Sequence, residues 1–218
     1  MDIGPIGIFI TMAIAHFLAL LSPGPDFILV VKSALKGNRK NATGVAFGIA
    51  TANAVYIGLC LIGIGAILST SVPLMIALKF IGGLFLIYIA YNALKAPKNA
   101  YQNMTVEPEG LANFSSLAFF REFITGFLSG ILNPKNLLFY LSLFTVALTP
   151  EVSFQFKLLL GAWMTAVVLF WDIAIIYVLS NKKVRNKFTK IAFYLDKITG
   201  VILGGIGFSI VKSVWANR

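Results

Sequence analysis

Residues 41–78 read NATGVAFGIATANAVYIGLCLIGIGAILSTSVPLMIAL, a stretch that contains no Asp, Glu, Lys or Arg. About 20 helical residues cross the hydrocarbon core of a bilayer, so this stretch is long enough for two spans. Residues 69–72 mark the turn between them, and Pro73 suits the first turn of the next helix, where its missing N–H costs no hydrogen bond. We therefore predict a hairpin of two transmembrane helices here.

The composition of the whole chain agrees with a membrane protein. Of the 218 residues, 58% are hydrophobic and 12% are charged, about half the charged share of a soluble domain. The single Cys60 and the single His16 exclude an internal disulfide framework and any metal site built from several Cys or His ligands. The net charge of +10 could suggest nucleic acid, but the cations cluster between apolar stretches, which favours a topological role.

Working outward from the hairpin, we predict an all-α integral membrane protein with six spans in a single transmembrane domain, residues 1–218. The first span, 5–31, and the fourth, 123–148, are each broken at proline. The sixth span is short and spans the bilayer only if it extends to about Trp215. The four unbroken spans are predicted at residues 43–68, 73–93, 158–179 and 198–211.

The basic residues predict the orientation of the spans. Connections after the first, third and fifth spans lie on one side and carry most of the Lys and Arg residues, whereas the opposite side has only Lys157 in its loops, with Lys212 and Arg218 near the C-terminus. Because cytoplasmic loops are enriched in Lys and Arg, both termini are predicted to lie outside. The first span lacks a basic leading segment and opens with Asp2, so we interpret it as retained and not as a cleaved signal peptide.

The second half of the sequence resembles the first. Leu21-Ser22-Pro23 aligns with Leu132-Asn133-Pro134, and Lys79-Phe80-Ile81-Gly82 aligns with Lys197-Ile198-Thr199-Gly200. Chance similarity between short apolar segments is the alternative. Three spans in each half is an odd number, so we predict two inverted three-helix repeats with broken first and fourth helices. Repeat one covers about residues 1–95, a polar cytoplasmic linker about 95–121, and repeat two about 122–218.

The broken helices predict where a substrate binds. Proline removes an N–H and leaves carbonyls and helix ends free, which survive at membrane depth only beside protein or water. The helix N-terminus after a break can hold a carboxylate, and the carbonyls before it can hold an ammonium, so an amino acid fits both. Paired breaks of this kind are typical of secondary transporters. The predicted substrate-binding residues are Ser22, Pro23, Gly24, Pro25, Asp26, Asn53, Asn133, Pro134 and Lys135.

Several motifs together resemble the lysine-exporter (LysE) family and its homoserine/threonine-resistance (RhtB) branch. They are Ser22-Pro23-Gly24-Pro25-Asp26, the basic link ending at Lys40, the helix with Gly44 and Gly48, and Asn133-Pro134-Lys135. The resemblance covers essentially the whole chain in length, span number and motif order. It implies an inner-membrane exporter of small amino acids that exchanges them for protons, with a homodimer possible. Position 26 is Asp here and can be Asn in the family, which argues against an essential proton-carrying role for Asp26.

Charged side chains at membrane depth need a partner or a water-filled cavity. Asp26 and Asp172 are the candidates for proton coupling. The alternative for Asp26 is an N-cap of the half-helix 27–31, and for Asp172 a fixed ion pair, for example with Lys79. Lys135 is expected either to pair with Asp26, to meet a substrate carboxylate, or to extend from a helix end toward the interface.

Two neutral residues complete the set of buried polar candidates. His16 is predicted to be a hydrogen-bonded packing residue, with a proton relay as the less favoured alternative. Asn53 hydrogen-bonds either the substrate or a neighbouring helix, and the sequence leaves both open. The glycine pairs Gly44 and Gly48, and Gly200 and Gly204, predict close helix packing.

Three functional classes remain, and transport is favoured. The preferred function is secondary active export of a homoserine-like or threonine-like amino acid, or of another neutral or basic one, by proton antiport. The alternative is a channel or an exporter for a different solute, which paired breaks argue against. An intramembrane enzyme is the remote alternative, because Ser129 and Ser142 near Lys135 sit in no nucleophile motif. No cofactor or metal is predicted.

Overall fold

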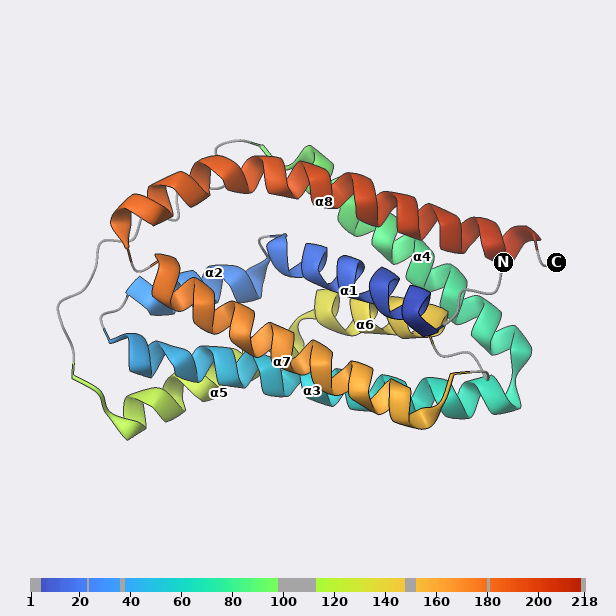
Figure 1. The fold of residues 1–218 in the computed structure, drawn as a ribbon, viewed down its shortest axis with the longest axis horizontal. Helices are drawn as coiled ribbons and strands as arrows, with labels where there is room; N and C mark the ends of the chain where they lie inside the picture. The colour runs from blue at the N-terminus through green and yellow to red at the C-terminus, as the bar shows by residue number, and fades with distance from the viewer. Residues whose placement is uncertain are drawn as a thin grey trace.

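The computed structural model describes residues 5–22, 24–35, 38–97, 113–147, 152–179 and 181–216. In this part of the chain the secondary structure is α-helical (Figure 1). The eight helices are α1 (Pro5–Leu21), α2 (Pro25–Leu35), α3 (Arg39–Thr70), α4 (Val72–Lys95), α5 (Ser116–Leu132), α6 (Pro134–Ala147), α7 (Phe154–Leu179) and α8 (Lys182–Ala216).

Several helices are long and apolar enough to cross a membrane. Four qualify alone, in α3, α4, α7 and α8, and α1 with α2 forms a fifth candidate bent by 55° at the break between them. At 1.5 Å per residue, the 17 residues of α5 and the 14 of α6 reach about 26 Å and 21 Å, so neither crosses a core of about 30 Å alone. The protein is a multi-pass all-α membrane protein.

The direction of the chain alternates along the long axis of the molecule. In Figure 1, α1 and α2 run from right to left, α3 returns, and α4 runs back toward the left. α5 and α6 then run together toward the right, α7 returns, and α8 ends on the side where α1 begins. The two broken pairs therefore each make one traverse of the molecule.

Both predicted helix breaks are confirmed. α1 ends at Leu21 and α2 begins at Pro25, while α5 ends at Leu132 and α6 begins at Pro134. Proline cannot donate to the carbonyl four residues back, so a helix stops before it and a new one starts with proline in its first turn.

The stretch 182–197, predicted as a connection, is helical, and the candidate span in α8, Phe193–Trp215, reaches the predicted end at Trp215. Helix α8 begins at Lys182 and not near residue 198, so the basic stretch that was expected to be a connection continues the helix. Lys and Arg are good helix formers, and the turn after α7 is made at Asn181. Near the middle of α8, the Lys197 ammonium donates to carbonyls at the end of α4, including those of Ala93 at 3.1 Å and Ala96 at 2.8 Å.

Glycine allows two helix pairs to pack backbone against backbone, and each pair joins the first half of the chain to the second. In the seam between α3 and α5, a Cβ on Gly48 would overlap the Phe123 carbonyl, and one on Gly126 would overlap the backbone of Val45. In the seam between α4 and α8, a Cβ on Gly207 would lie 2.7 Å from the carbonyl oxygen of Gly83. The predicted role of Gly44, Gly48, Gly200 and Gly204 in close packing is confirmed.

The break between α1 and α2 lies at the junction of two apolar clusters. Met12 and Ala15 of α1 pack into one cluster with residues of α3, α4, α6, α7 and α8. Phe27 and Val30 of α2 pack into the other with residues of α3 and α7. Polar side chains at this junction are therefore enclosed by apolar packing on either side.

Candidate functional site

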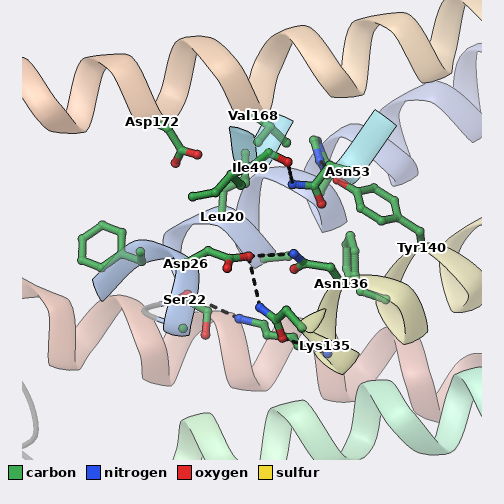
Figure 2. Close-up of a pocket in the computed structure, with 16 residues that line it drawn as sticks. Leu20, Ser22, Asp26, Ile49, Asn53, Lys135, Asn136, Tyr140, Val168 and Asp172 are labelled. Atoms are coloured by element: carbon green, nitrogen blue, oxygen red, sulfur yellow. Dashed lines mark hydrogen bonds between the residues drawn. The ribbon is translucent and has the colours of Figure 1, made fainter. Parts of the chain in front are cut away.

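A cavity of about 60 Å³ lies where the two broken helices meet (Figure 2). At about 10 to 15 Å³ for each water molecule, it has room for about four to six water-sized groups. Most of the predicted site residues line it: Ser22, Gly24, Asp26, Asn53, Asn133, Lys135 and Asp172. Of the others, Pro25 and Pro134 begin α2 and α6, and Pro23 lies outside the described residues.

Asp26 accepts hydrogen bonds at both of its carboxylate oxygens. Its Oδ1 accepts from Ser129 Oγ at 2.6 Å, and its Oδ2 accepts from the side-chain amides of Asn133 at 3.1 Å and Asn136 at 2.6 Å. Figure 2 shows Asp26 and Asn136 facing each other. The donors come from α5, α6 and the residue between them, so Asp26 connects α2 of the first half to the second break.

The second break is capped by its own side chain. The Oδ1 atom of Asn133 accepts from the backbone N–H of Lys135 at 3.0 Å, and the Asn133 carbonyl accepts from the N–H of Asn136 at 3.1 Å. An Asn before the first helical residue satisfies N–H groups that have no partner in the helix. With its oxygen used for this cap, the Asn133 amide nitrogen points to Asp26.

The first break is held by side chains from the second half. The ammonium of Lys135 donates to the Ser22 carbonyl at 3.4 Å, a contact visible in Figure 2. A Cβ on Gly24 would lie 3.3 Å from the same ammonium. The Ser22 hydroxyl donates to Asp196 on α8 at 2.9 Å, and Lys135 interacts electrostatically with both Asp196 and Asp26.

The opposite wall of the cavity carries Asp172 on α7, which points from its helix toward the cavity in Figure 2. This residue is only 6% exposed. Its Oδ2 atom has no hydrogen-bond partner in the described part of the chain. Lys79, offered as a fixed partner, does not line the cavity with it.

The neutral residues of this wall are partly engaged. His16 Nε2 and the Tyr140 hydroxyl lie 3.2 Å apart, as expected for a hydrogen-bonded packing histidine. The Asn53 amide donates to the Ile49 carbonyl of its own helix at 2.9 Å. In this structure the donor is therefore used neither for a substrate nor for a neighbouring helix, the two partners predicted for it.

Sequence reasoning missed several residues at this site. Asn136 follows the Asn-Pro-Lys motif within one helical turn, a signal that was available. Tyr140 lies another turn further on and Asp196 lies in a stretch that was expected to be a connection, so neither carried a signal. Within the described ranges, no group of three or more His, Cys, Asp or Glu side chains is placed to hold a metal ion.

The arrangement offers both signs of charge to one small ligand. The N-terminus of α6 and the Lys135 ammonium present positive charge. The Asp172 carboxyl group lies on the facing wall and is negative once it has lost its proton. A zwitterion with its two charged groups on neighbouring atoms suits such a cavity.

Comparison with known proteins gives an independent result. The model of the LysE type translocator family matches residues 17–213. The threonine efflux protein of Salmonella typhi is 27% identical over 206 residues, covering 94% of this chain and 98% of that protein. The threonine efflux protein of Escherichia coli (strain K12) is 26% identical with the same coverage.

A relative with another named substrate also matches. The leucine efflux protein of Klebsiella pneumoniae subsp. pneumoniae is 23% identical over 191 residues, covering 82% of this chain and 85% of that protein. No solved structure matches the chain significantly. Since the family match includes both helix breaks and every described residue lining the cavity except His16, the chain belongs to the LysE type translocator family.

Proposed function

We propose that this protein is a secondary active exporter of small amino acids that exchanges them for protons. The substrate is homoserine-like or threonine-like, or another neutral or basic amino acid of similar size. The observation that carries the proposal is the small cavity between two broken helices, lined by an ammonium and by carboxylates. The relatives named for threonine and leucine efflux support export over catalysis.

The substrate carboxylate binds at the start of α6. The positive end of the α6 helix dipole attracts anions, and the Lys135 ammonium adds a full positive charge there. Asn53 and Asn136 supply amide groups within the same cavity. The cavity volume of about 60 Å³ favours a small side chain over a large one.

The architecture we propose for this function is six spans in two inverted repeats. The broken pairs α1–α2 and α5–α6 are the first spans of the two repeats, which the segment between α4 and α5 joins. The alternating chain direction in Figure 1 supports this arrangement. The excess of Lys and Arg on one side supports a bacterial inner-membrane location with both termini outside.

Transport follows from movement of one repeat against the other. An amino acid enters the cavity from the cytoplasm, rocking of the repeats exposes it outside, and a carboxylate of the cavity returns with a proton. Asp26 and Asp172 are the carboxylates that line the cavity. Broken helices place helix ends at the site, which is the arrangement expected for alternating access.

Release of amino acids from dipeptide-loaded cells tests the proposal. Cells that express the protein should release one small group of amino acids faster than cells without it, and Asn133→Ala should abolish the difference. Glu122→Gln is the matched control, because Glu122 contacts Ser33 away from the cavity. Equal release across the panel, with the protein verified in the membrane, would contradict amino-acid export and favour another solute.

The coupling to protons needs a separate experiment. In proteoliposomes, an imposed pH gradient should drive the amino acid in the direction opposite to proton flow. An imposed substrate gradient should in turn drive protons in the direction opposite to the substrate. Flux that follows only the substrate gradient would indicate a channel.

A further inference from the structure

The two carboxylates that line the cavity differ in their hydrogen bonding. Both oxygens of Asp26 accept hydrogen bonds, from three donors in total. Asp172 is buried, and its Oδ2 atom has no partner among the described residues. An unpartnered buried carboxylate is costly. The hydrogen-bonding capacity of Asp26 is used within the protein, whereas Asp172 has an oxygen available to a ligand.

The other charged and titratable groups of the cavity do not supply Asp172 with a fixed cation. From α1 it is faced by His16, which is engaged with Tyr140 of α6. From α2 comes Asp26, which is an anion itself, and from α6 comes Lys135, whose ammonium contacts the first break. Helix α3 contributes Ile49 and Asn53, which do not titrate, and α7 adds Val168.

We propose that Asp172 is the site at which the substrate ammonium and the transported proton bind in turn. This inference rests on the proposed function and assigns its coupling to one residue. When the ammonium arrives, the carboxylic acid gives up its proton to water and the carboxylate binds the ammonium. When the substrate leaves on the other side, the carboxylate takes up a proton from water there. The ammonium takes the place of the proton at Asp172, but the amino acid also brings its carboxylate, so the substrate-loaded site carries one more negative charge than the protonated site.

Asp26 then has a different role from Asp172. It is a positioning residue that holds Ser129, Asn133 and Asn136 around the second break. In this scheme it neither contacts the ammonium nor carries the proton. The substrate lies between Asp172 on one wall and Lys135 on the other, with its ammonium and carboxylate facing opposite charges.

Proton release on substrate binding is the direct test. Purified protein in weakly buffered detergent is mixed with L-threonine, L-homoserine or L-leucine, and a pH-sensitive dye reports released protons. The wild type should release about one proton for each substrate bound. Its apparent affinity should fall about tenfold for each pH unit on the acid side, as competition at one site requires.

Variants of Asp172 test whether its carboxylate is the site of proton exchange. Asp172→Asn should release no proton, should bind the amino acid about 10- to 100-fold more weakly at high pH, and should show no pH dependence of binding. Asp172→Glu restores a carboxylate and should restore proton release. Glu122→Gln should behave as the wild type, because this residue does not line the cavity.

A substrate analogue separates ammonium binding from carboxylate binding. The 2-hydroxy acid that corresponds to threonine keeps the carboxylate and lacks the ammonium. It should bind without releasing a proton from the wild type. Release of a proton by this analogue would overturn the assignment of the ammonium to Asp172.

Two failures are distinguishable. If the wild type binds and exports an amino acid while Asp172→Asn keeps proton release and pH dependence, the role of Asp172 is overturned and the proposed function stands. If the wild type binds none of the amino acids, the proposed function fails and this inference fails with it. Size-exclusion chromatography and thermal unfolding show that each variant is folded, and Asp172→Glu decides the outcome if Asp172→Asn does not fold.

Discussion

The break between α1 and α2 and the break between α5 and α6 both interrupt a helix at proline, but different parts of the protein hold them. At the second break, Asn133 caps α6 from within the same segment. At the first break, the Ser22 carbonyl accepts from Lys135 on α6 and the Ser22 hydroxyl donates to Asp196 on α8. The second break has a cap from its own segment in addition to its contacts with Asp26, whereas the side chains that contact Ser22 at the first break come from distant helices.

The two breaks should respond differently when the surrounding helices move. A cap made by the neighbouring side chain persists when distant helices shift. Contacts that come from α6 and α8 change whenever these helices move relative to α1. In a transporter that works by movement of one repeat against the other, the first break is therefore the one whose geometry follows the conformational state.

The largest effect is expected from Asp26→Ala, which should loosen the second break from α2. It leaves three donors without their acceptor, and hydrogen bonds between membrane helices are worth about 0.6 to 1.7 kcal/mol each. The unfolding free energy in detergent should fall by about 2 to 4 kcal/mol. Asp26→Asn, which keeps one acceptor oxygen, should lose about half as much. A loss below about 0.5 kcal/mol for Asp26→Ala would show that the three bonds do not stabilise the fold.

The next effect concerns the first break and its charges. Lys135→Met should destabilise the protein by about 2 kcal/mol, because it removes the cation beside Asp196 and the donor to Ser22. In a double-mutant cycle with Asp196→Asn, the two losses should be less than additive by about 0.5 to 3 kcal/mol. Simple additivity, measured by thermal or denaturant unfolding, would show that α8 does not act on the first break through Lys135.

Equivalent substitutions at the two breaks compare them directly. Asn133→Ala removes a helix cap and a donor to Asp26, and should cost about 1.5 kcal/mol. Ser22→Ala removes one donor to Asp196 and should cost about 0.6 kcal/mol. Hydrogen exchange should show faster opening of the first turn of α6 in Asn133→Ala. The reverse order of stabilities would contradict local capping of the second break.

The smallest effect is expected from Gly24→Ala. The new Cβ would lie 3.3 Å from the Lys135 ammonium, which is the end of a flexible side chain and can move aside. The change in unfolding free energy should stay within about 0.5 kcal/mol. Because Lys135 must move, the pH and substrate dependence of export should change more than stability does. A loss of several kcal/mol would mean that the first break is more tightly packed than its contacts indicate.

Proline made both breaks predictable from the sequence. Its effect on a helix is local, so Pro25 and Pro134 mark helix starts without knowledge of the fold. The long uncharged stretch at 41–78 was equally informative, because its length alone requires membrane spans. Glycine spacing in α3 predicted close packing, although it could not name α5 as the partner.

The rest of the site depends on packing that has no local signal. Asp196 reaches Ser22 because α8 lies against α1, and Tyr140 reaches His16 because α6 does. The helical stretch 182–197 was predicted as a connection for a related reason. Basic residues before an apolar span are as compatible with a loop as with a continuing helix, and only the structure distinguishes them.

The two glycine seams also constrain how the protein is made. Gly48 on α3 meets α5, and Gly83 on α4 meets α8, so each seam pairs an early segment with a late one. During synthesis the first half enters the membrane with its glycine faces uncovered, and they stay uncovered until the second half arrives. Neither half can complete its packing alone, so folding in the membrane is completed only when the two halves come together. Separately expressed halves should persist in the membrane only when both are present.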